Sequence, residues 1–145
     1  MSPFTVGVEE EYQIVHAADR GLRSRAKGLL REAHEEVGLR PEDVRVLGLL
    51  DDYVTSSGYV VTPVVGWVPH PYVYRAAPEE VDVVLQLPLA AFLTPQRART
   101  LAFEGLRRIV MAFDVEGHFI WGATASMLRD LARRLRGEAP AAESP

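Results

Sequence analysis

The chain has 145 residues, of which 48% are hydrophobic and 25% charged, and it carries a formal net charge of −4. This size suits one domain with its own core, and the charge argues against binding to a nucleic-acid backbone. The absence of cysteine excludes a disulfide scaffold, a thiolate zinc site and a cysteine nucleophile. No uninterrupted apolar run is long enough to span a bilayer and the start does not read as a leader, so we expect a cytoplasmic protein without a membrane partner.

The first predicted element is a strand over Phe4–Val15. Its apolar residues alternate with polar ones, and Glu9–Glu11 supply the acids of this stretch. A helix is then predicted over about Ser24–Val37. Gly38 is its natural C-terminal stop, because glycine accepts the left-handed conformation found there.

The middle of the chain is rich in β-forming residues. Strands are predicted between Val44 and Trp67, with a turn at Ser56–Gly58, and a further short strand at Val81–Leu87. A helical turn is expected at Leu89–Leu93.

Towards the C-terminus the pattern predicts a hairpin, in which Leu106–Phe113 and Phe119–Trp121 pair across the turn at Asp114–Gly117. A last helix is predicted over Ala125–Arg136, because its leucines recur on one face. Helices therefore flank a region of strands. The predicted class is α+β, with a mixed sheet flanked by helices.

The densest charge pattern is the run REAHEEVGL at residues 31–39. Helical geometry places Glu32, Glu35 and Glu36 within about 100° of one another on one face. Such like charges repel, so a positive partner is expected. Arg31 is one candidate, and a hard divalent cation such as Mg²⁺, which prefers carboxylate oxygens, is another. The alternative is a solvated acidic helix face, as most charge runs are.

The order Arg-Glu-x-x-Glu-Glu-x-Gly-aliphatic resembles the second half of the Nudix box. The resemblance implies that Glu35 and Glu36 are the main ligands of Mg²⁺ or Mn²⁺. It implies that Glu32 is a further ligand, or the catalytic group that orients or deprotonates water, and that Arg31 fixes the carboxylates. His34 occupies a variable position and receives no role.

Three longer segments resemble one branch of the Nudix hydrolases, the coenzyme A pyrophosphatases. These segments are Leu50–Val68, Glu79–Leu93 and Gly117–Leu128, and the whole resemblance covers residues 28–136. It implies an α/β/α sandwich and cleavage of the diphosphate in coenzyme A, an acyl-coenzyme A or a related nucleotide derivative. The products would be 3′,5′-ADP and a 4′-phosphopantetheine species.

The first half of the box is missing. Arg23 stands where the box has glutamate and Ala17 where it has glycine, and the strands that normally precede the helix are absent. This predicts a sandwich that is incomplete at its N-terminus. It also leaves a second function open, that of a catalytically impaired Nudix-like binding domain or remnant.

Residues 1–27 resemble a different family. The stretch PFTVGVEEEYQIV, followed by LRSRA, is similar to the N-terminus of glutamate–cysteine-ligase-like carboxylate–amine ligases, which use ATP. The sequence thus divides into a ligase-like start at 1–27, a Nudix-like domain at 28–136 and a disordered tail at 137–145. A ligase fragment is the third candidate function, and an exposed acidic strand edge is the plainer interpretation of Glu9–Glu11.

Other side chains are candidates for the same chemistry. Glu79 and Glu80 precede a predicted strand where a loop could supply extra carboxylates, although exposed loop acids are the simpler interpretation. The expected partner is a small nucleotide diphosphate such as coenzyme A, and exposed sheet edges predict a homodimer. Aromatic residues suited to stacking on adenine, or to packing in the core, are Trp67, Tyr72 and Tyr74.

Overall fold

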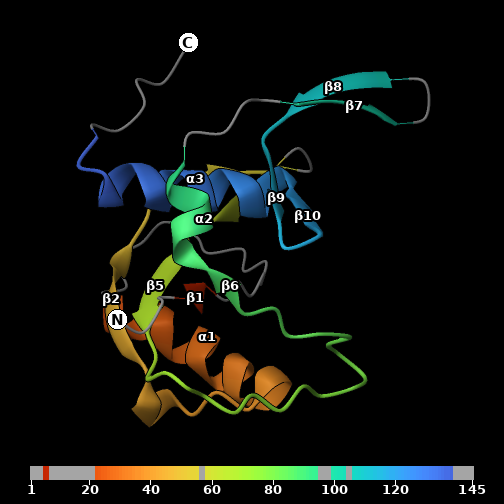
Figure 1. Ribbon diagram of the computed structural model, residues 1–145. Helices are drawn as coiled ribbons and strands as arrows, with labels where there is room; N and C mark the ends of the chain where they lie inside the picture. The colour runs from red at the N-terminus through yellow and green to blue at the C-terminus, as the bar shows by residue number, and fades with distance from the viewer. Residues whose placement is uncertain (1–4, 7–21, 56–57, 95–98, 104–105, 139–145) are drawn as a thin grey trace. The chain divides into compact units, whose positions relative to one another are not determined.

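The computed structural model describes residues 5–6, 22–55, 58–94, 99–103 and 106–138 (Figure 1). The chain divides into two compact units. The first, here the α1 unit, spans residues 7–86. The second, the α3 unit, spans residues 87–145 together with residues 3–6. Within the described ranges, no helix has the length and apolar character needed to cross a bilayer.

The α1 unit begins with helix α1, Leu22–Val37, which starts two residues before the predicted helix. Ala26 and Ala33 lie two helical turns apart on the same face, and both are buried with 2% of their surface exposed. The predicted stop is confirmed, because Gly38 has a φ of +70° and its N–H donates to the carbonyl of His34 at 3.1 Å.

After α1 come the short 3₁₀ helix η1, Pro41–Asp43, and two antiparallel strand pairs. Strand β2, Arg45–Leu49, pairs with β5, Val64–Trp67, and it also contacts α1. Strands β3, Tyr53–Val54, and β4, Val60–Val61, form a hairpin. These pairs confirm the predicted β region; Ser56 and Ser57 of its predicted turn lie outside the described residues.

The strand predicted at Val81–Leu87 is wrong for most of its length. A turn occupies residues 78–80, and the N–H groups of Glu80 and Val81 both donate to the carbonyl of Ala77. Val83 is 64% exposed, and no strand among the described residues pairs with residues 81–86. The apolar residues of this run therefore do not form the predicted strand. Within residues 81–88, the strand that forms is β6, Leu87–Pro88.

The α3 unit contains strand β1, Thr5–Val6, paired antiparallel with β6. The rest of the strand predicted over Phe4–Val15 lies outside the described residues. Helix α2, Leu89–Leu93, confirms the predicted helical turn. The last helix, α3, covers Gly122–Leu135 and begins three residues before the predicted start.

The turn of the predicted C-terminal hairpin is confirmed, but the first of its two predicted strands is wrong for most of its length. Strand β9, Ala112–Val115, pairs with β10, His118–Trp121. Strand β8, Leu106–Val110, pairs instead with β7, Arg99–Phe103. The run that reads as one strand therefore divides at Met111, where no pairing is made.

The core of the α3 unit forms around two rings. Phe92 of α2 and Phe113 of β9 are each 1% exposed, and their ring centroids lie 5.1 Å apart in an edge-to-face arrangement. At the end of α3, Arg136 donates to the carbonyl of Leu93 at 2.8 Å, which ties α3 to α2.

The α+β class is confirmed. Among the described residues every strand pair is antiparallel and two-stranded, whereas the sequence predicted a mixed sheet. The proposed division at residues 27–28 falls inside α1 and stays a prediction about the origin of the sequence.

Candidate functional site

The acidic face of α1 is defined as Glu32, Glu35 and Glu36. Its side chains differ in their exposure to solvent. The side chain of Glu32 is 21% exposed and that of Glu35 is 60% exposed. Arg31 lies between them, with a guanidinium nitrogen 3.9 Å from a carboxylate oxygen of each. Because Arg31 is itself 69% exposed, water screens both pairs and they are weak. The role of Arg31 in fixing the carboxylates stays a prediction.

Backbone bonds hold the C-terminal end of α1. The N–H of Ala77 donates to the carbonyl of Glu36 at 2.7 Å, and the N–H of Arg75 donates to the carbonyl of Val37 at 2.9 Å. A helix leaves its last carbonyls without partners inside the helix, so the extended segment 72–77 supplies donors that the helix lacks. This fixes the position of the helix end within the α1 unit.

Gly38 is required at this point for two reasons. Its φ of +70° is a conformation that L side chains rarely adopt. In addition, a Cβ placed there would lie 3.2 Å from the Cβ of Arg75. The sequence predicted the first reason from the helix stop and gave no sign of the second.

Glu79 and Glu80 reach the neighbourhood of α1 through the turn that follows Ala77. The N–H of Glu80 donates to the carbonyl of Ala77 at 3.0 Å, and both glutamate side chains are exposed. The fold therefore brings the backbone of these two residues close to the end of the helix. Their role as extra carboxylates stays a prediction.

The acidic face offers carboxylate oxygens, which are the donors that Mg²⁺ and Mn²⁺ accept in proteins, so its chemistry fits such a cation. Over the described ranges, however, no three acidic or histidine side chains gather closely enough to hold a metal ion. The metal-binding roles of Glu32, Glu35 and Glu36 stay predictions.

Tyr72 connects the segment after β5 to η1. Its hydroxyl accepts a hydrogen bond from the N–H of Arg40 at 3.0 Å and donates to Oδ2 of Asp43 at 3.0 Å. The same carboxylate accepts from Nε of Arg40 at 2.8 Å. The hydrogen bond from Arg40 is the main reason why the pKa of Asp43 is lowered. The Tyr72 hydroxyl therefore links the segment after β5 to Arg40 and Asp43.

The second tyrosine of this segment packs beside the first. The ring centroids of Tyr72 and Tyr74 lie 5.1 Å apart, with their planes inclined by 52°. Burial raises the pKa of the Tyr74 hydroxyl, and the neighbouring Tyr72 adds to the effect. Trp67, the third aromatic candidate, lies in β5 and is 41% exposed. Adenine stacking by any of the three stays a prediction.

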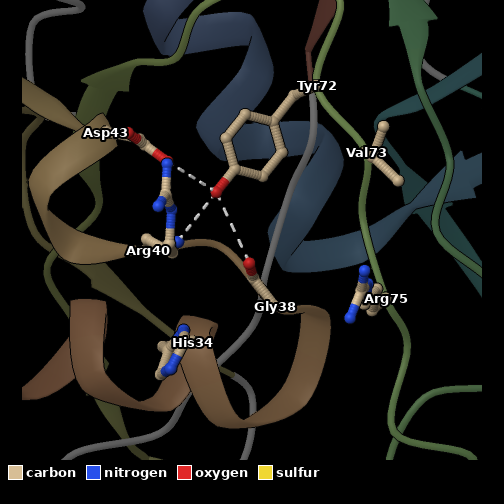
Figure 2. A pocket seen from close by; sticks show the side chains of 7 residues that line it. All are labelled: His34, Gly38, Arg40, Asp43, Tyr72, Val73 and Arg75. Atoms are coloured by element: carbon tan, nitrogen blue, oxygen red, sulfur yellow. Dashed lines mark hydrogen bonds and ion pairs between the residues drawn. The ribbon is translucent and has the colours of Figure 1, made fainter.

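A cavity of about 460 Å³ opens beside these hydrogen bonds, and Figure 2 shows the Tyr72 hydroxyl directed towards its partners at one wall. Sequence reasoning missed the cavity because its walls come from residues far apart in the chain that form no motif. We call it the helix-end cavity; its lining residues are His34, Gly38, Arg40, Asp43, Tyr72, Val73 and Arg75.

Comparison with known proteins gives no matching family model, but it gives similar proteins. The chain is 37% identical to an uncharacterized Nudix hydrolase NudL of Enterobacter sp. (strain 638), over 82% of this chain and 63% of that protein. It is 39% identical to the NudL of Escherichia coli (strain K12) over the same shares. The NudL of E. coli (strain SMS-3-5 / SECEC) is 41% identical over 73% of this chain and 56% of the relative.

The chain thus spans about three-fifths of the length of these relatives. The likeness supports a relationship to Nudix hydrolases, as the half box predicts.

Proposed function

We propose that this relative of the Nudix hydrolases is a metal-dependent hydrolase that cleaves a diphosphate linkage in a nucleotide derivative. The observation that carries the proposal is the acidic face of α1 with Arg31 between two of its carboxylates, in a chain 37–41% identical to proteins named Nudix hydrolase. Glu35 and Glu36 would hold Mg²⁺ or Mn²⁺, and Glu32 would be a further ligand.

Such a cation neutralises charge on a diphosphate and makes its bound water more acidic. The chain's own groups have separate tasks. Glu32, the more shielded of the two carboxylates beside Arg31, orients or deprotonates the attacking water. The task proposed for Arg31 is to orient Glu32 and Glu35, since its two terminal nitrogens are each 3.9 Å from an oxygen of one of them.

Within this class, we propose coenzyme A or one of its thioesters as the substrate. The support is the similarity of Leu50–Val68, Glu79–Leu93 and Gly117–Leu128 to the coenzyme A pyrophosphatase branch. Hydrolysis would place water's oxygen on one phosphorus and leave two phosphate monoesters, 3′,5′-ADP and 4′-phosphopantetheine.

The test is a turnover assay on the full chain with coenzyme A, in which Mg²⁺ is titrated and 3′,5′-ADP is measured by chromatography. We expect turnover that requires the metal and that Glu36→Gln abolishes. Glu42→Gln is the matched control, because Glu42 is an exposed acid of η1 outside the acidic face. Metal-independent turnover, or equal activity of Glu36→Gln and the parent, would contradict the proposal.

The second candidate is a Nudix-like domain that binds a nucleotide without cleaving it. Two observations favour it: Arg23 replaces the first box glutamate, and no three-carboxylate cluster is found among the residues that the structure describes. Saturable binding of coenzyme A with no product formed at any Mg²⁺ concentration would select this candidate. The third candidate, a ligase fragment, depends on residues 1–27, most of which lie outside the described ranges.

A further inference from the structure

We propose that the helix-end cavity binds a small phosphorylated ligand, at a site separate from the acidic face. The two sites lie on different sides of the same helix. His34, which lines the cavity, is about 200° around the axis from both Glu32 and Glu36, and about 100° from Glu35. The proposal does not depend on the proposed hydrolase activity.

The walls of the cavity carry positive charge in a chain whose net charge is −4. Asp43 neutralises Arg40 through Nε, at 2.8 Å, and Glu42, which does not line the cavity, lies 4.0 Å from the same nitrogen. Within the described ranges, the guanidinium of Arg75 makes no hydrogen bond or ion pair to another residue. Arg75 therefore gives the walls a net positive charge, and the two arginines together offer a group of N–H donors that suits an oxyanion.

Backbone carbonyls at the end of α1 would normally repel an anion, because the C-terminus of a helix carries partial negative charge. Here the carbonyls of Glu36 and Val37 already accept hydrogen bonds from the N–H groups of Ala77 and Arg75. These hydrogen bonds partly offset the negative charge on the two carbonyl oxygens, which reduces their repulsion of a bound anion.

The cavity is also held in shape before any ligand arrives. Tyr72 joins the segment 72–77 to Arg40 and Asp43, and Gly38 lets Arg75 approach the helix end closely. The hydrogen bond between Asp43 and Arg40 lowers the pKa of the acid and raises that of the base, so the pair stays ionised. A preformed site lowers the ordering cost of binding.

The size and donor arrangement favour a phosphate group. A cavity of about 460 Å³ is in the range of sites for small molecules. Its side-chain donors, at His34, Arg40 and Arg75, come from two separate stretches of the chain. A tetrahedral phosphate presents oxygens in several directions, whereas a carboxylate has two in one plane. Val73, which is 80% exposed, adds an apolar surface for the rest of the ligand.

The test is calorimetric titration of the full chain with inorganic phosphate, in the presence of a metal chelator and at constant ionic strength. We expect saturable binding that Arg75→Gln weakens by about tenfold or more, the effect of one charge-assisted hydrogen bond. Arg75→Lys keeps the positive charge but lacks the several N–H donors of the guanidinium, so it should weaken phosphate binding by an intermediate amount. Acetate serves as the carboxylate probe and should bind more weakly than phosphate.

Two controls separate this site from general charge and from the acidic face. Arg129→Gln removes the same charge from an exposed position of α3 and should leave phosphate binding unchanged. The chelator is the second control, because it removes any cation through which phosphate could bind at the acidic face. Circular dichroism verifies that each variant is folded. The proposal fails if phosphate does not bind, if acetate binds equally well, or if Arg129→Gln costs as much as Arg75→Gln.

Discussion

The two sides of helix α1 to which functions are proposed differ in charge and in the way they are built. The acidic face consists of glutamates three and four residues apart on one helix, and it presents oxygen donors. The helix-end cavity collects arginines from separate segments and presents N–H donors. Under the two proposals, one side binds a cation and the other binds an anion. The comparison teaches that a single helix can serve opposite chemistries when its C-terminal end is capped by another part of the chain.

The largest expected effect concerns the acidic face. Glu36→Gln should reduce diphosphate hydrolysis by several orders of magnitude, because an amide keeps the shape of the side chain and loses the charge that a hard cation requires. Without metal, thermal stability should be unchanged or raised by a few tenths of a kcal/mol, since repulsion along the helix is relieved. Coenzyme A turnover and thermal denaturation measure the two effects. Parent-like turnover would show that the metal assignment is wrong.

The second prediction concerns Gly38, which follows the end of α1 and lines the cavity. Gly38→Ala should lower the free energy of unfolding by about 2 kcal/mol, because alanine must adopt a left-handed φ and also approach Arg75. The matched control is Gly48→Ala, at a position with no atom within 4 Å of an added Cβ. Urea denaturation of both variants compares them. Equal stability of the two would contradict the role assigned to Gly38.

The third prediction concerns the wall of the cavity. Tyr72→Phe should lower the free energy of unfolding by about 1 kcal/mol, because its hydroxyl accepts from Arg40 and donates to Asp43. Tyr74→Phe is the control, since in the described ranges the Tyr74 hydroxyl makes no hydrogen bond. It should change stability by less than about 0.5 kcal/mol. If the two variants lose equal stability, ring packing rather than the hydroxyl holds the segment.

The smallest expected effect depends on pH. The pKa of Asp43 is lower in the folded chain than its ordinary value, so its ionised form stabilises the fold above that ordinary value. This stabilisation is lost as the pH falls through the folded-state pKa. Asp43→Asn should therefore be less stable than the parent at neutral pH, and the difference should shrink in strong acid. Urea denaturation across this range would contradict the assignment if the difference were constant.

Local patterns were the predictable part of this molecule. The helix, its stop at Gly38 and the arrangement of the acidic face follow from spacing within a few turns, and the turn at Asp114–Gly117 follows from residues next to each other. Long-range pairing was harder to foresee. The run Leu106–Phe113 reads as one strand because its sequence does not show that β7 will take one half and β10 the other.

The helix-end cavity was beyond sequence reasoning for the same reason. Arg40 and Tyr72 are 32 residues apart, and neither belongs to a recognisable motif. Arg75 was not singled out, because an exposed arginine is ordinary in any sequence. The hydrogen bonds from Arg75 and Ala77 to α1, and those of the Tyr72 hydroxyl with Arg40 and Asp43, bring these groups together.

The capping of α1 also has a consequence for local unfolding. The last turn of the helix and the segment 72–77 share hydrogen bonds through Glu36 and Val37, so neither can open while the other stays fully bonded. Their amide protons should therefore exchange with solvent as one cooperative group, although the two stretches are far apart in sequence. A ligand that stabilises the cavity would slow exchange in both stretches together.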